Sequence, residues 1–110
     1  MNIEGAKIPQ IPLEEVNKQI VSQYRERLMS LLESQERIDL ENESKFFENL
    51  EDNYKKELSN RGLLDTYDKN YTLWTIIDST RAEIELTLPG QPVSREYLQQ
   101  MVEKVDNLFQ

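Results

Sequence analysis

The sequence contains neither cysteine nor histidine. Without cysteine the chain has no disulfides and no thiolate nucleophile, and the two absences together remove the usual ligands of zinc. Histidine is also the commonest general base near neutral pH, so acid–base catalysis would need other side chains. These absences weigh against most enzyme classes, and the sequence indicates no cofactor.

Long apolar runs are missing as well. No stretch approaches the 18 consecutive apolar residues of a membrane-spanning helix. The first fifteen residues, MNIEGAKIPQIPLEE, lack the apolar segment of a signal peptide. We therefore expect a cytoplasmic protein that does not enter membranes.

Basic residues are scarce, with 13 Lys and Arg against 21 Asp and Glu and a net charge of -8. This charge argues against direct binding to nucleic acid or to anionic membranes, both of which require cationic surfaces. It is compatible with a basic protein partner. With 110 residues, of which 37% are hydrophobic, the chain is expected to form one domain with a thin core and to associate into homo-oligomers.

Few glycines and prolines interrupt the chain, and they mark its predicted organisation. Gly5 and Pro9 indicate an extended N-terminal arm over residues 1–11. Residues 12–110 are predicted to form a single all-α domain, a small bundle of three or four helices. Apolar residues at intervals of three and four predict these helices at 12–37, 42–60, 71–88 and 95–109.

Two of the predicted boundaries remain open to an alternative. No glycine or proline separates the first two helices, so a single bent helix over 12–60 is the alternative to a turn with Asp39 or Asn42 as N-cap. The segment 71–88 also alternates in a way that suits a β-hairpin, which would make the fold α+β. Its turn lacks the Asn-Gly or Asp-Gly signal of a tight hairpin, which favours the helix.

Acidic residues gather in one block. Eight acids and two bases lie between Glu33 and Asp52, a net charge of -6 and three quarters of the total. Such a block is either a solvated surface or an anionic surface that selects a basic partner. The acids predicted to contact a partner are Glu41, Glu43, Glu48, Glu51 and Asp52.

Aromatic residues are the second candidate for binding. Tyr67, Tyr71 and Trp74 lie close together in the sequence, and tyrosine and tryptophan dominate the hot spots of protein interfaces. At helical spacing such residues also form cores, which is the competing interpretation. Because the helix containing Trp74 is apolar on more than one side, a helix of a second subunit is a further candidate to cover it.

Pairs of glutamates raise a catalytic alternative. Glu33 and Glu36, and likewise Glu48 and Glu51, are three residues apart, which places each pair on one helical face. Facing pairs can hold Mg²⁺ through oxygen ligands. Over about twenty residues this spacing resembles the paired acidic motifs of all-helical nucleotide pyrophosphohydrolases. The resemblance implies a Mg²⁺-dependent nucleotide hydrolase with these four glutamates at the metal.

The sequence as a whole favours a non-enzymatic, acidic helical interaction protein. Such a protein would act as an adaptor, inhibitor or assembly factor, bind a protein partner and self-associate. The hydrolase is one alternative. A second is an oligomeric small-ligand-binding protein in which Tyr71, Trp74 and Arg81 hold an anion.

Overall fold

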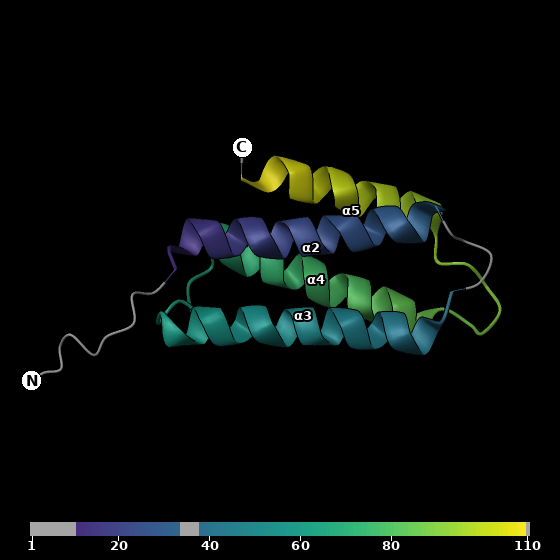
Figure 1. The fold of residues 1–110 in the computed structure, drawn as a ribbon, viewed down its shortest axis with the longest axis horizontal. Helices are drawn as coiled ribbons and strands as arrows, with labels where there is room; N and C mark the ends of the chain where they lie inside the picture. Colours follow the sequence, from purple (N-terminus) through teal and green to yellow (C-terminus); the bar gives the residue numbers. More distant parts are fainter. Residues whose placement is uncertain (1–10, 34–37, 110) are drawn as a thin grey trace, which may run out of the picture.

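The computed structural model describes residues 11–33 and 38–109, and four helices make up most of them (Figure 1). The helices are α2 (Leu13–Glu33), α3 (Leu40–Asn60), α4 (Lys69–Leu86) and α5 (Arg95–Leu108). This part of the chain contains no strand, so the all-α bundle is confirmed and the hairpin at 71–88 is wrong. Residues 1–10 of the predicted arm, and residues 34–37 of the predicted first helix, lie outside the described residues.

Successive helices run in opposite directions and form an up-down-up-down bundle (Figure 1). The contacts between α2 and α5 show this reversal. Arg25 Nε lies 2.8 Å from Asp106 Oδ1, and Arg95 Nη1 donates to the Leu32 carbonyl at 2.6 Å. Residue numbers therefore rise along one helix as they fall along the other. Each helix packs on two neighbours, and α3 with α4 is the most extensively packed pair.

Three helices begin at a short polar residue whose side chain accepts a hydrogen bond from the first turn. The N-caps are Asp39 for α3, Asp68 for α4 and Ser94 for α5. Each satisfies a backbone N–H that has no partner within its helix. Because Asp39 has extended backbone angles and starts a new helix, the single helix over 12–60 is wrong.

The end of α3 explains the position of one glycine. Gly62 has φ of +69°, a left-handed conformation that glycine adopts without steric penalty. Its N–H donates to the Ser59 carbonyl, and the N–H of Leu63 donates to the Leu58 carbonyl at 2.8 Å. These two bonds form a Schellman motif, which turns the chain back towards α4.

The core is built from the apolar stripes of all four helices. Phe47 and Tyr54 are fully buried, so these two aromatic residues belong to the core and not to a binding surface. The buried apolar residues are Val16, Ile20, Tyr24, Leu28, Leu31, Phe47, Leu50, Tyr54, Leu58, Leu73, Ile76, Ile77, Ile84, Val93, Leu98, Met101 and Val105. Among the described residues, no helix combines the length and apolarity needed to cross a bilayer.

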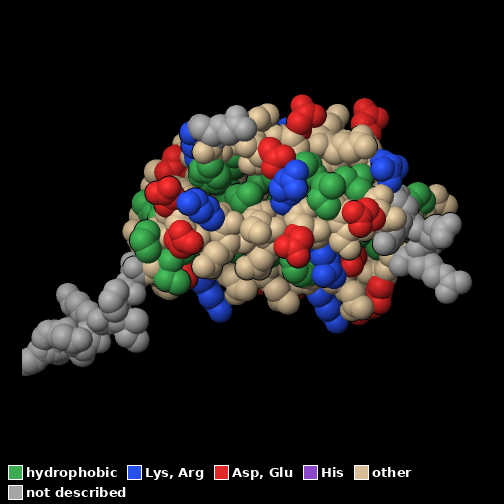
Figure 2. All heavy atoms as spheres, turned by 45° about the horizontal axis from the view of Figure 1, so that its top comes forward, with side chains coloured by type: hydrophobic (Ala, Val, Ile, Leu, Met, Phe, Trp, Pro, Cys, Tyr) green, Lys and Arg blue, Asp and Glu red, His purple; other side chains and the backbone are tan. Residues whose placement is uncertain are grey.

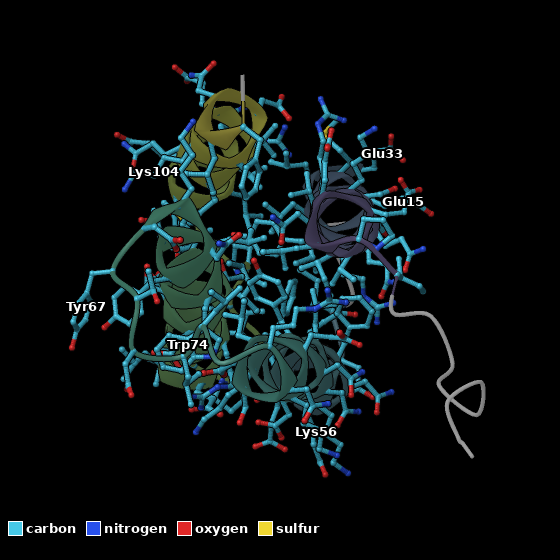
Figure 3. The ribbon with its side chains drawn as sticks, turned by 90° about the vertical axis from the view of Figure 1, so that its left-hand side faces the viewer. Glu15, Glu33, Lys56, Tyr67, Trp74 and Lys104 are labelled. Atoms are coloured by element: carbon cyan, nitrogen blue, oxygen red, sulfur yellow. The ribbon has the colours of Figure 1, made fainter. Side chains whose placement is uncertain are left out.

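Buried hydrogen bonds join α2 to α4, which lie diagonally across the bundle (Figure 3). Asn17 Nδ2 donates to Asn70 Oδ1 at 2.8 Å, and the Tyr54 hydroxyl donates to Asn17 Oδ1 at 2.6 Å. Two turns after Asn17 in α2, the Tyr24 hydroxyl lies 2.6 Å from the hydroxyl of Thr80 in α4. Burial raises the pKa of both tyrosines, so their hydroxyls stay protonated. Since an unpaired buried polar group costs about 1–3 kcal/mol, these bonds fix the register of the two helices.

Candidate functional site

An aromatic ladder, defined as Tyr67, Tyr71 and Trp74, occupies the loop before α4 and its first turns. The Tyr67 side of the ladder is open, because this residue is 82% exposed. Ring centroids are 4.8 Å apart between Tyr67 and Tyr71, and 5.8 Å apart between Tyr71 and Trp74. Figure 3 shows Tyr67 pointing away from the bundle, with Trp74 on the same side of the molecule. The Tyr67–Tyr71 pair is edge-on, and packing of this kind holds an exposed ring in place and contributes about 0.5–1.5 kcal/mol.

Trp74 contains a buried polar atom without a hydrogen-bond partner. Its indole Nε1 is buried and has no hydrogen-bond partner in the structure. Buried indole N–H groups normally donate a hydrogen bond, because leaving one unpaired costs about 1–3 kcal/mol. Because Nε1 is buried, an acceptor from a partner could pair with it only after the surrounding side chains had moved.

Two turns beyond Trp74, the guanidinium of Arg81 contacts three carboxylates. Arg81 bonds Glu51 Oε1 through Nε at 2.8 Å, Asp78 Oδ1 through Nη2 at 2.6 Å and Glu85 through Nη1 at 3.1 Å. Glu51 comes from α3 and the other three residues from α4. Three negative charges around one positive charge give this arginine cluster a net charge of -2. It is therefore not a place where Arg81 can attract an anionic ligand.

The carboxyls of the arginine cluster differ in acidity. Burial is the main cause that raises the pKa of Glu51 above its ordinary 4.5, and the neighbouring Asp78 raises it further. The pKa of Asp78 is lowered, mainly by its hydrogen bond with the Glu51 carboxyl and also by Arg81. The same carboxylates raise the pKa of Arg81, which stays charged. On acidification Glu51 therefore takes up a proton before Asp78 does.

The five predicted partner-binding acids divide into two groups. Glu51 is 7% exposed and bound to Arg81, and Glu43 bonds Arg27 through two hydrogen bonds of 2.7 and 3.0 Å. These two acids neutralise arginines within the bundle. The remaining three acids, Glu41, Glu48 and Asp52, are exposed on α3.

The three exposed acids of α3 are weakly paired, or not paired, with cationic side chains of the described residues. Glu41 lies 3.5 Å from Lys45 in a pair that is highly exposed on both sides. Glu48 and Asp52 form no ion pair with a described residue. Exposed pairs such as that of Glu41 are weak, so all three carboxylates remain available to a cationic surface.

The paired glutamates are not brought together as a metal site in the part of the chain that the structure describes. Glu48 is exposed whereas Glu51 is buried against Arg81, although they are only three residues apart. Glu33 lies at the exposed end of α2, and Glu36 is outside the described residues. Within residues 11–33 and 38–109, no three His, Cys, Asp or Glu side chains are grouped to hold a metal ion.

Sequence reasoning missed an apolar feature at the other end of the α3–α4 pair. Leu86 and Leu88 are 79% and 69% exposed, beside a groove of about 480 Å³ lined by residues that include Leu40, Glu48 and Pro89. The sequence predicts a helix that extends to residue 88, but α4 ends at Leu86. Pro89 explains the difference, because a residue before proline is pushed out of the helical conformation.

The chain was also compared with known proteins. No family model, no curated protein and no solved structure matches it.

Proposed function

We propose that this chain is a non-enzymatic interaction protein, an adaptor, inhibitor or assembly factor, that binds a basic protein partner on the outer side of α3 and α4 and self-associates. The observation that carries the proposal is the aromatic ladder. Tyr67 is 82% exposed and packs edge-on against Tyr71, so a large rigid ring is presented to solvent. Exposed tyrosine and tryptophan side chains of this kind supply much of the binding energy in protein interfaces.

Charge supports the choice of a basic partner. Helix α3 has six acids and three bases, a net charge of -3, and Glu48 and Asp52 on its surface form no ion pair with a described residue. Asp65 and Asp68 lie beside the ladder. Negative charges at the edge of an interface accelerate association with a positive partner and reject negative ones. The aromatic rings would supply affinity and the carboxylates selectivity.

The two alternative functions gain no support from the site. The hydrolase requires Glu51 at a metal, but Glu51 is bound to Arg81. The anion-binding alternative requires Arg81, which three carboxylates surround. We therefore retain the interaction protein, and with it the cytoplasmic location predicted from the sequence.

The test compares proteins captured from a cytoplasmic extract by the wild type and by two variants. Tyr67→Ser removes the exposed ring, and because that ring is 82% exposed the fold is expected to survive. Leu88→Ser is the matched control, since Leu88 is a large apolar residue that is 69% exposed and lies beyond the other end of α4. Quantitative mass spectrometry is expected to find partners that Tyr67→Ser loses and Leu88→Ser keeps.

A second comparison tests the role of charge. Glu48→Gln with Asp52→Asn removes two exposed carboxylates of α3, and Glu96→Gln with Glu103→Gln removes two exposed carboxylates of α5. The first pair is expected to weaken capture and to reduce its dependence on salt, and the second to change neither. If all variants capture the same proteins in the same amounts, the proposed function is wrong.

A further inference from the structure

The seam between α2 and α5 is hollowed at two places. The first hollow, of about 580 Å³, lies where α2 begins and α5 ends. Its apolar lining is Val21, Val105 and Phe109, and Glu14 and Lys18 are among the charged residues around it. Figure 2 looks onto this side of the molecule, where hydrophobic side chains gather among both acidic and basic ones.

The second hollow lies at the other end of the same seam. It has a volume of about 340 Å³ and an apolar lining of Met29, Leu32 and Val102, with Glu33 and Arg95 as its charged residues. Because α2 and α5 are antiparallel, the two hollows lie in line along the outside of the pair. Each contains an exposed apolar side chain, Phe109 at 40% in the first and Met29 at 36% in the second.

Charge favours this seam over the α3–α4 side as the place where two copies meet, because α4, with three acids and two bases, adds -1 to the charge of α3. Helix α2 has four acids and three bases, and α5 has three acids and two bases, so each carries -1. Helix α3 carries -3, with six acids and three bases. Like charges brought face to face oppose association, so two copies of a chain with a net charge of -8 need a nearly neutral face.

We propose that the α2–α5 seam is the interface of a homodimer, in which two copies pack antiparallel and the Phe109 end of one covers the Met29 end of the other. A twofold axis perpendicular to the seam produces this pairing, and the commonest soluble oligomers have such symmetry. The inference rests on the self-association in the proposed function and not on its partner binding.

The charged residues of the two hollows are complementary in this arrangement. The twofold axis brings the hollow with Glu14 and Lys18 opposite the hollow with Glu33 and Arg95. Lys18 of one copy then faces Glu33 of the other, and Glu14 faces Arg95.

The experiment measures the mass of the purified full chain by light scattering and sedimentation over a range of concentrations. The wild type is expected to be a dimer. Phe109→Glu and Met29→Glu place a charge in the seam at exposed positions, and each is expected to raise the dissociation constant at least about tenfold. Tyr67→Glu, which alters the exposed ladder on the other pair of helices, is the control that stays dimeric. Circular dichroism checks that all four proteins are folded.

A charge exchange tests the antiparallel arrangement itself. Lys18→Glu opposes two acids across the interface and is expected to weaken the dimer, and adding Glu33→Lys is expected to restore it. A wild type that is monomeric at every concentration overturns the interface and self-association together, while partner capture stays a separate result. A dimer that Tyr67→Glu dissociates and Phe109→Glu does not also overturns the interface, because self-association then belongs to the aromatic ladder.

Discussion

The two antiparallel pairs in this bundle, α3–α4 and α2–α5, are built differently. The α3–α4 pair is the most extensively packed and is crossed by the Arg81 cluster, with Glu51 buried beneath it. The α2–α5 pair has two apolar hollows along its seam, and its ion pair between Arg25 and Asp106 is about 40% exposed on both sides. The α3–α4 pair is closed along its middle and exposes apolar side chains at its two ends, at Tyr67, Leu86 and Leu88. The α2–α5 pair is instead hollowed along its seam.

The difference shows that a residue's type does not reveal whether it serves the fold or a surface. Glutamates of α3 illustrate this, because Glu51 is buried against an arginine and Glu48, one turn away, is exposed. Aromatic residues divide in the same way, with Tyr54 fully buried and Tyr67 fully outside the core. The packing around each position decides which role the side chain takes.

The largest expected effect concerns packing. Leu58→Ala in α3 empties a site that is 2% exposed, and we expect it to lower the free energy of unfolding by about 2–5 kcal/mol. Leu108→Ala in α5 is the matched change at a half-buried site and is expected to cost less than half as much. Urea denaturation measures both values. Equal losses would show that the α2–α5 pair is packed as closely as the other.

The next effect concerns the hydrogen bonds that join the two pairs. Asn17→Ala removes the partner of both Asn70 and Tyr54, and we expect a loss of about 1–3 kcal/mol because buried polar groups are left unpaired. Asn53→Ala, at an exposed position of α3, controls for the higher helix propensity of alanine. A loss no greater than that of the control would mean that the diagonal bonds contribute little.

Two arginines, one in each pair, allow a direct comparison of ion pairs. Arg81→Gln leaves the buried Glu51 without its cationic partner, and we expect a loss of roughly 1–3 kcal/mol. Arg25→Gln breaks only an exposed pair and is expected to leave the thermal midpoint nearly unchanged. Similar shifts for the two variants would contradict the difference drawn between the pairs.

The smallest effect is a dependence on pH. The pKa of Glu51 in the folded chain is above its ordinary 4.5, so the folded state binds a proton more readily than the unfolded state. Stability from this group is present below pH 4.5 and falls as the pH rises through the folded pKa. The window from about pH 5 to about pH 7 lies above that ordinary value. As the pH rises through it, we expect the change in the free energy of unfolding to be less favourable for the wild type than for Glu51→Gln.

Urea midpoints at several pH values in this window measure the difference in slope between the wild type and Glu51→Gln. The lowered pKa of Asp78 acts in the opposite direction, because its contribution is lost as the pH falls below its ordinary 3.8. The measurement is therefore made above that pH. Parallel slopes for the two proteins would show that Glu51 keeps its ordinary acidity in the folded chain.

Much of the fold could be predicted because its signals are local. Asp39, Asp68 and Ser94 are each an N-cap where a polar residue precedes an apolar stripe, and Gly62 takes the left-handed conformation expected at the end of a helix. These features depend on a few neighbouring residues, which the sequence displays directly. The same is true of the aromatic ladder, whose three members are close in the chain.

The features that could not be predicted depend on contacts between distant residues. Nothing in the local sequence distinguishes Glu43 and Glu51, which bond arginines of other helices, from Glu48, which bonds no arginine among the described residues. Asn17 was overlooked because it lies beside an apolar stripe and its partner is 53 residues away. The α2–α5 seam requires the relative position of two helices from opposite ends of the chain, which periodicity alone does not supply.

The diagonal hydrogen bonds have a consequence for the order of folding during synthesis. Asn17 and Tyr24 find their partners at Asn70 and Thr80, which the ribosome adds more than fifty residues later. Until α4 has emerged, the Asn17 amide nitrogen and the Tyr24 hydroxyl lie on the apolar face of α2 without the hydrogen-bond partners that α4 supplies. We therefore expect the first half of the chain to reach its final packing only after α4 has been made.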